Sequence, residues 1–373
     1  MSGPEDEREE RQRQGEDTLE EQAASVTGEI TETDRQDPSV LQRIQRTLHK
    51  YPWLAPLVFL GVMLVIFSFG NERFLTPFNA SLIVQQVMFV GTLAIGQTII
   101  ILTAGIDLSV GAIAVFVSVI MGKLSADFGV PGAAALIIGF GFGTAAGLLN
   151  GILITRLRLP PFIVTLGTLS IFFALNLYVS ASTTIDGRDM DPIMTWTGTR
   201  IDVPFIETAV PISSFLMLGM FAIMWYVLKY TAWGRHIYAT GDDPESSRLI
   251  GIKVDRVLLA VYGVAGLIYA VGGWFLLGRL GAASPQAGQD ANLDSITAVV
   301  IGGTSLFGGR GTVIGTLLGA IIVGVARNGL AISQFQIGDT LIIKFDPLWQ
   351  GFTIGVLVIV FVALDQWVRR VSN

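Results

Sequence analysis

Long apolar segments constrain this chain more than any other feature of its sequence. They recur between residues 53 and 366, and several reach the roughly 20 residues that a helix needs to cross a bilayer. Only 14% of the residues are charged, whereas an average soluble domain carries about 25%. The sequence therefore predicts an all-α polytopic membrane protein with about ten transmembrane helices. The expected segments are 53–70, 80–103, 108–123, 131–155, 162–182, 210–228, 257–280, 296–309, 312–331 and 348–366.

One of these segments, 296–309, is too short to span a bilayer as a straight helix. The glycine pairs Gly302–Gly303 and Gly308–Gly309 interrupt it. We expect a broken or re-entrant helix, which a membrane tolerates only where protein or a watery cavity covers its backbone.

Glycines also form a ridge on the expected helix 131–155. They recur every four residues, at Gly139, Gly143, Gly147 and Gly151. A ridge of this kind lets two helix backbones approach closely in lipid, where no hydrophobic effect drives their association. We expect these glycines to serve helix packing.

The first 37 residues differ from the rest of the chain. They hold 13 Asp and Glu against 4 Arg and have almost no apolar content, which is typical of a disordered, solvated tail. We therefore divide the chain into an acidic cytoplasmic tail, 1–37, and a transmembrane domain, 38–373.

The distribution of basic residues predicts the orientation of the chain. With both termini in the cytoplasm, the inner loops and ends hold 14 Lys and Arg, and the outer loops and nearby helix ends hold 7. This asymmetry follows the positive-inside rule. It places the polar loop 229–256 in the cytoplasm and the acidic loop 183–209 outside.

Signatures of catalysis are absent from the sequence. There is no cysteine, no phosphate-binding GxxxxGK[ST] loop, no HExxH or GxSxG motif and no paired cluster of metal ligands. We expect no catalytic residue, no metal site and no nucleotide site in this chain. The pattern indicates a conduit rather than an enzyme.

Two acidic residues stand next to apolar runs. Asp107 precedes "LSVGAIAVF" and Asp294 precedes "SITAVV". A carboxylate at a helix centre costs about 2.5–3.5 kcal/mol on insertion scales, so we expect both at helix ends. Each is predicted to cap a helix N-terminus, and lining a solute path is a compatible second role.

The stretch "ATGDDPESSRLIGI" (239–252) predicts a short helix over 244–250 within the polar loop. Asp243 is a good N-cap, Pro244 suits the first helical position, and Gly251 suits a left-handed turn at the end. A helix of seven residues is not stable alone in water. It must pack either on its own chain or on a cytoplasmic partner.

This stretch resembles the cytoplasmic loop of membrane permeases from bacterial ABC importers of the ribose/xylose/galactose class. Three further stretches resemble signatures of that family, in the same order. They are "VGTLAIGQTIIILTAGIDLSVGAI" (90–113), "GLLNGILITRLRLPPFIVTLGTLSI" (147–171) and "LDSITAVVIGGTSLFGGRGTVIGTLLGAIIVG" (293–324). The resemblance runs from about residue 53 to the C-terminus. Ser246 and Ser247 depart from it where small alanines are usual, and Pro244 replaces a more ordinary helix former.

The resemblance implies a multi-pass permease subunit in the bacterial plasma membrane. It implies a second permease subunit, an extracytoplasmic solute-binding protein, a cytoplasmic ABC ATPase that holds the ATP and Mg, surrounding membrane lipid and no nucleic acid. In the family the cytoplasmic loop carries a coupling helix that docks on the ATPase. The residues that would couple to the ATPase are Asp243, Pro244, Glu245, Ser246, Ser247, Arg248 and Gly251.

A sugar in transit needs polar groups within the helices to form weak hydrogen bonds. We expect the path to be lined by Gln97, Thr165, Thr168, Asn176, Asp294 and Thr304. Nucleosides, a signalling furanone or branched-chain amino acids are alternative solutes. Amino acids are less favoured, because no buried basic residue is evident to hold a carboxylate. An ATPase-independent carrier or channel would leave the helix at 244–250 without a function.

Overall fold

The computed structural model describes residues 54–203, 208–288, 290–332, 334–337, 341–344, 349, 351–356, 359–360 and 363. These residues belong to one compact unit, Tyr51–Asn373. The predicted tail 1–37, both chain ends and most of the expected segment 348–366 lie outside the described residues.

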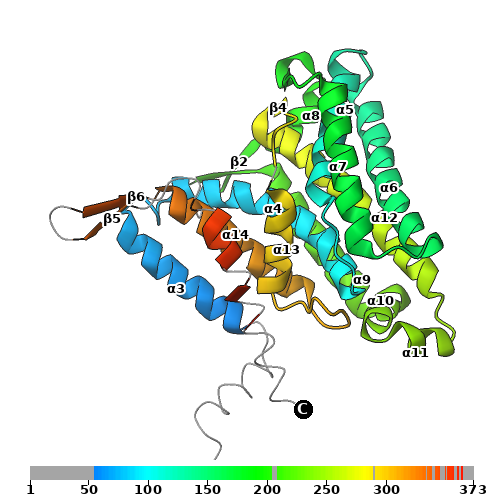
Figure 1. Cartoon of the computed structure of the whole chain (residues 1–373). Helices are drawn as coiled ribbons and strands as arrows, with labels where there is room; N and C mark the ends of the chain where they lie inside the picture. The colour runs from blue at the N-terminus through cyan, green and yellow to red at the C-terminus, as the bar shows by residue number, and fades with distance from the viewer. Residues whose placement is uncertain are drawn as a thin grey trace, which may run out of the picture. The chain divides into compact units, whose positions relative to one another are not determined.

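Nine helices account for the first nine expected segments (Figure 1). They are α3 (Leu54–Gly70), α4 (Pro77–Leu102), α5 (Val110–Ala126), α6 (Gly132–Arg156), α7 (Pro161–Ser180), α9 (Ile212–Tyr230), α12 (Val254–Leu280), α13 (Ala291–Ile301) and α14 (Val313–Ile332). Within the described residues, six of them are long and apolar enough to cross a membrane, namely α4, α6, α7, α9, α12 and α14. The chain is therefore a mostly helical, multi-pass membrane protein.

Short elements fill the connections between these helices. The loop after α7 contains the 3₁₀ helices Gly187–Asp189 and Trp196–Gly198, and α8 (Pro192–Thr195) lies between them. Strand β1 (Ile185–Asp186) pairs antiparallel with β4 (Ala282–Ala283). The described residues also contain two antiparallel hairpins: β2 (Arg200–Val203) with β3 (Thr208–Pro211), and β5 (Gln334–Ile337) with β6 (Leu341–Lys344).

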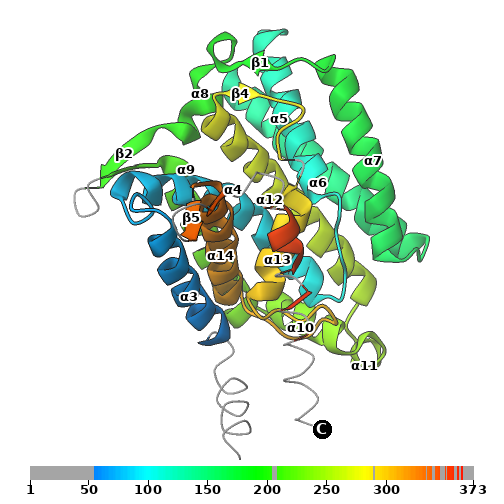
Figure 2. The ribbon, with the colours of Figure 1, turned by 60° about the vertical axis from the view of Figure 1, so that its left-hand side comes forward.

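Helix α12 lies at the centre of the packing and contacts α6, α4 and α5 (Figure 2). Three of the four glycines in the ridge of α6 lie against it. A Cβ atom at Gly147 would collide with the main-chain oxygen of Tyr262, and one at Gly143 would lie 2.7 Å from the oxygen of Gly266. The prediction that the ridge serves helix packing is confirmed, because only glycine allows this approach.

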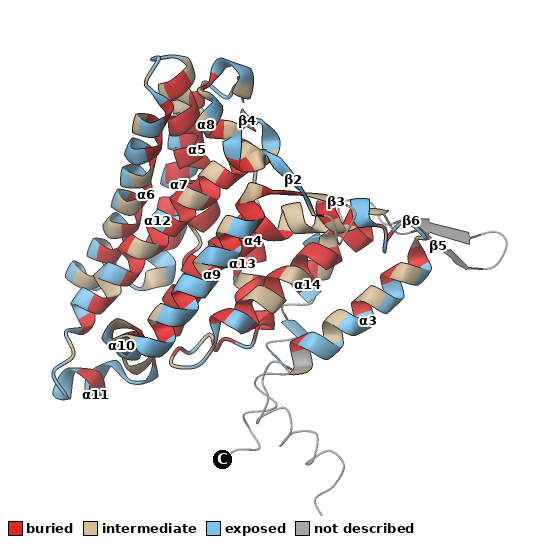
Figure 3. Ribbon diagram, turned by 180° about the vertical axis from the view of Figure 1, so that it is seen from behind, coloured by how far each residue is buried: buried red, intermediate tan, exposed pale blue. Residues whose placement is uncertain are grey.

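The helices differ in how much apolar surface they bury within the chain (Figure 3). Of the apolar windows of α4 and α14, 78% and 72% are buried, against 28% of that of α7. The exposed side of α7 carries large apolar side chains such as Ile163 and Tyr178. Such a surface is suited to lipid or to another membrane subunit.

The interrupted segment forms a short helix followed by a compact loop. Helix α13 has 11 residues and ends at Ile301, and turns over residues 302–312 lead into α14. A Cβ atom at Gly302 would lie within 2.6 Å of main-chain atoms of α14, and Gly303 adopts a φ of +83°. Both predicted structural glycines thus occupy positions that other residues would strain.

Candidate functional site

The predicted short helix is present as α11 (Pro244–Leu249) and begins with a side-chain cap. Oδ1 of Asp243 accepts hydrogen bonds from the N–H groups of Glu245 (2.9 Å) and Ser246 (3.1 Å). The Ser246 hydroxyl also donates to this carboxylate. The hydrogen bond from the Ser246 hydroxyl is the largest cause that holds the pKa of Asp243 below its usual value, and the bonds from the two N–H groups lower it further. The cap is confirmed, and Gly251 has the expected left-handed φ, +91°.

One side of α11 packs on the chain and the other is bare. Ser247 is buried, and α11 contacts α10 (Ala232–Asp242) and α12. Leu249 and Ile250 are 88% and 76% exposed. Together they form a small apolar surface that a partner protein could cover. The sequence analysis missed both, although two adjacent apolar residues in a polar loop were the available signal.

Helix α10 joins this short helix to the membrane helices through main-chain atoms. A Cβ atom at Gly241 would collide with the main-chain oxygen of Leu102, the last residue of α4. The same oxygen accepts a hydrogen bond from the N–H of Gly309 (3.0 Å). On the other side, Tyr238 donates its hydroxyl to the oxygen of Gly311 (2.9 Å). We call Leu102, Gly241 and Gly309 the main-chain joint.

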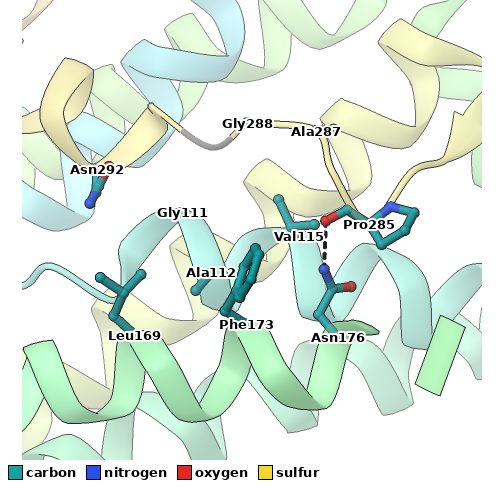
Figure 4. Close-up of a pocket in the computed structure, with 10 residues that line it drawn as sticks. All are labelled: Gly111, Ala112, Val115, Leu169, Phe173, Asn176, Pro285, Ala287, Gly288 and Asn292. Atoms are coloured by element: carbon teal, nitrogen blue, oxygen red, sulfur yellow. Dashed lines mark hydrogen bonds between the residues drawn. The ribbon is translucent and has the colours of Figure 1, made fainter. Parts of the chain in front are cut away.

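A cavity of about 240 Å³ lies between α5, α7 and the connection that leads into α13. Figure 4 shows Leu169, Phe173 and Asn176 of α7 facing α5 and this connection. The Asn176 amide donates to the oxygen of Pro285 (2.7 Å), and its Oδ1 is buried without a partner. The lining is neutral and consists of Gly111, Ala112, Val115, Leu169, Phe173, Asn176, Pro285, Ala287, Gly288 and Asn292. An aromatic ring beside amides suits a small, uncharged polar solute.

Asn176 is the one predicted path residue that lines this cavity. Thr165 and Thr168 are buried on the same helix, where Thr165 donates to the oxygen of Ile106 (3.0 Å) and Thr168 to that of Thr165 (3.3 Å). Thr304 lies in the loop after α13, and its buried hydroxyl has no partner. The structure thus does not gather the six predicted residues into one site.

Gln97 belongs to a buried polar cluster in the middle of the bundle. With its amide nitrogen assigned toward Tyr269 from the surrounding hydrogen bonds, Gln97 donates to the Tyr269 hydroxyl (3.3 Å) and to the main-chain oxygen of Asp107 (3.2 Å). Its oxygen accepts from the Asp107 N–H (3.3 Å). Gln97 therefore fixes the segment before α5.

The prediction that Asp107 is the N-cap of the next helix is wrong. The N-cap of α5 is Ser109, whose carbonyl accepts the first helical bond from Ile113. Asp107 is 1% exposed, and its Oδ1 accepts from the N–H (2.7 Å) and the hydroxyl (2.6 Å) of Ser109. Asn150 of α6 donates to the same hydroxyl (2.9 Å). The carboxylate thus ties this turn to α6.

The capping prediction for Asp294 is also wrong. Helix α13 begins three residues earlier, so the Asp294 N–H already donates to the oxygen of Asp290. Its carboxylate instead pairs with Arg327 of α14, with Nη2 2.8 Å from Oδ1 and Nε 2.8 Å from Oδ2. Arg327 also lies 3.3 Å from Asp290. The sequence analysis missed this pair, because 33 residues separate its members.

Comparison with known proteins shows which family this chain resembles. Residues 79–362 match the family described as "Branched-chain amino acid transport system / permease component". The chain is 44% identical to a fructose import permease protein of Rhizobium meliloti, over 94% of this chain and 95% of the relative. It is 37% identical to a ribose import permease protein of Bacillus subtilis, over 84% and 92%, and 34% identical to a D-allose transport system permease protein of Escherichia coli, over 83% and 90%. No solved structure matches the chain.

Proposed function

The chain belongs to this family of transport permeases, and on that premise we propose that it is the membrane-spanning subunit of an ABC importer for a monosaccharide. The observation that carries this proposal is the 44% identity to a fructose import permease over nearly the full length of both chains. The permease spans the bacterial plasma membrane several times and does not itself catalyse a reaction.

The neutral cavity between α5 and α7 supports a sugar as the solute. Asn176 offers an unpaired amide oxygen and Phe173 offers an aromatic ring, while no lining residue is charged. An amino acid carries two charges that would need partners in the protein. Arg327 of α14 could hold a carboxylate, but it is already paired with Asp294. These features favour an uncharged solute over an amino acid.

The bare side of α11 supports docking of a separate ATPase. Leu249 and Ile250 are exposed, whereas Ser247 anchors the helix to its own chain. We propose that residues 243–251 form the coupling element and that the main-chain joint conveys its movement to α4. The other proposed partners are a solute-binding protein on the outer side and a second copy of this chain.

A second solute class has one observation in its favour. The chain is 31% identical to an autoinducer 2 import system permease protein of Photorhabdus luminescens, over 88% of this chain. This identity is lower than that to the fructose permease. We therefore place a signalling furanone second and the monosaccharide first.

Uptake into proteoliposomes tests the solute. The permease, its ATPase and its binding protein would be reconstituted and supplied with labelled fructose, ribose, allose, autoinducer 2 or leucine. We expect ATP-dependent uptake of a sugar and none of leucine. Uptake of leucine instead of any sugar would show the monosaccharide proposal to be wrong, and uptake of autoinducer 2 alone would replace it with the second candidate.

The variant Asn176→Leu tests the cavity in the same assay. It removes the unpaired amide oxygen from the lining, so we expect sugar uptake to fall about 10-fold or more, the usual cost of one lost polar contact. Ser170→Leu is the matched control, because Ser170 is exposed on the same helix and does not line the cavity. Copurification of the ATPase shows that both variants still assemble.

A single cysteine tests the coupling element, since the chain has none of its own. Glu245→Cys places the thiol on the exposed side of α11, and Arg200→Cys places it on the exposed β2 hairpin of the opposite predicted side. We expect Glu245→Cys to crosslink to the ATPase with a yield that changes with ATP, and Arg200→Cys not to crosslink. Equal yields, or no crosslink in an intact complex, would overturn the assignment.

A further inference from the structure

A second cavity, of about 490 Å³, lies where the end of α9, helix α10 and the start of α14 meet. One wall, at the start of α14, is formed by Thr312, Val313 and Ile314. The remaining lining residues come from α9 and α10 and are Trp225, Leu228, Lys229, Arg235 and Tyr238. This cavity shares no lining residue with the one beside α7.

The cavity carries two cations, Lys229 and Arg235, that form no ion pair with any acidic side chain in the described part of the chain. The Lys229 ammonium instead lies over the rings of Trp225 (5.1 Å) and Tyr230 (5.3 Å). Two uncompensated positive charges on one rim are suited to an anionic group.

The other residues that line the cavity are largely apolar. Leu228 and Val313 are buried in its wall, and Ile314, which also lines it, is 53% exposed. The exposed rings of Trp225, Tyr226 and Tyr230 gather at this end of α9. Such aromatic residues mark the level of the lipid headgroups.

We propose that this cavity binds an anionic phospholipid, with its phosphate between Lys229 and Arg235 and its acyl chains beside Ile314. Basic pockets between helices at the cytoplasmic surface are suited to anionic headgroups, because the inner leaflet is negatively charged. A free anion would not use the apolar half of the cavity, whereas a phospholipid uses both halves.

The position of the lipid has a consequence for α10. Arg235 and Tyr238 both belong to this helix, and Tyr238 also donates to Gly311 in the loop before α14. A phosphate between Arg235 and Lys229 would therefore join α10 to α9 on one side, while Tyr238 joins it to that loop on the other. The lipid would hold α10 in place next to the short helix α11.

Quenching of tryptophan by brominated lipid tests the site in the purified permease, without its ATPase. Trp225 lines the cavity, so Trp225→Phe identifies its share of the emission. We expect brominated phosphatidylglycerol to quench this share at lower concentration than brominated phosphatidylcholine. Lys229→Gln/Arg235→Gln should reduce that preference about 30-fold, because each basic residue contributes about a fivefold preference.

The matched control is Arg156→Gln/Arg158→Gln, which removes two exposed cations from the same predicted side but outside the cavity. We expect it to keep the preference for the anionic lipid. The proposal is overturned if both lipids quench Trp225 equally in the natural sequence, or if the control loses as much preference as the cavity variant. Because no transport is measured, the result does not depend on which solute the permease carries.

Discussion

Two helix pairs in this molecule each pack through glycines and each lie beside a buried aspartate, but the two aspartates have different kinds of partner. In the pair α6–α12, Gly147 packs on Tyr262, and Asp107 nearby accepts hydrogen bonds from the neutral Ser109. In the pair α13–α14, Gly302 packs on α14, and the aspartate pairs with a cation of that helix.

The difference follows the lengths of the helices. Helices α6 and α12 have 25 and 27 residues and contact one another over a long seam. Helix α13 has only 11 residues, and helices that short are not stable without tertiary contacts. Arg327 fixes the beginning of α13 to α14, and Gly302 fixes its end. An ion pair is thus used where the seam is short.

The largest effect should follow from Arg327→Gln. This variant leaves the buried Asp294 carboxylate without its cation, so we expect a loss of about 3–5 kcal/mol in the free energy of unfolding. Denaturant titration of the purified protein in detergent measures it. The double variant Asp294→Asn/Arg327→Gln should recover most of the loss, because no charge is then stranded. A single variant as stable as the natural protein would mean that the pair does not hold α13.

Gly147→Val tests the long seam and should cost less. The added side chain would collide with the main-chain oxygen of Tyr262, and overpacking of a tight core costs about 1–3 kcal/mol. Gly141→Ala is the control, because no atom lies within 4 Å of a Cβ atom there. In thermal unfolding, the Tm of Gly147→Val should be lower than that of Gly141→Ala. Equal stability would show that α6 and α12 can move apart freely.

Asn328→Ala tests a neutral contact of α14, for comparison with the ion pair that Arg327, the preceding residue, forms with Asp294. Asn328 of α14 and Asn79 of α4 exchange two buried amide hydrogen bonds (2.8 and 2.9 Å). Hydrogen bonds between membrane helices contribute about 0.6–2 kcal/mol, so we expect a loss in that range. A double-mutant cycle with Asn79→Ala isolates the pair. A coupling as large as that of Arg327 and Asp294 would contradict the distinction between charged and neutral contacts.

The smallest effect should follow from Asp107→Asn. An amide oxygen can accept the same two bonds from Ser109, and the substitution removes a buried charge that has no cation partner among its described contacts. We expect a change below about 1 kcal/mol, whereas Asp107→Ala should lose about 1–3 kcal/mol because the Ser109 donors lose their acceptor. A large loss in the Asn variant would show that the negative charge itself is needed.

Local features were predictable from the sequence because neighbouring residues determine them. Asp243, Pro244 and Gly251 start and end one short helix, and the ridge containing Gly147 repeats at the period of a helix face. The positions of the apolar segments follow from length and composition in the same way.

Contacts between distant residues were not predictable in this way. The start of a helix depends on the conformation of the loop before it. In this chain α13 begins three residues ahead of Asp294. The partner of that carboxylate, Arg327, lies on another helix. The cavity beside Asn176 likewise needs the loop at Pro285 to be folded over α7. A polar residue in an apolar segment indicates a polar neighbour but does not identify it.

The main-chain joint has a consequence for how this protein can change over evolutionary time. Its contacts use the carbonyl of Leu102, the N–H of Gly309 and the bare backbone of Gly241. Any side chain at Gly241 would break the joint, so that position has almost no freedom to vary. The cavity on α7 is instead lined by ordinary side chains. On the proposed assignment, selection can therefore alter the solute through those side chains while the proposed coupling machinery is inherited unchanged.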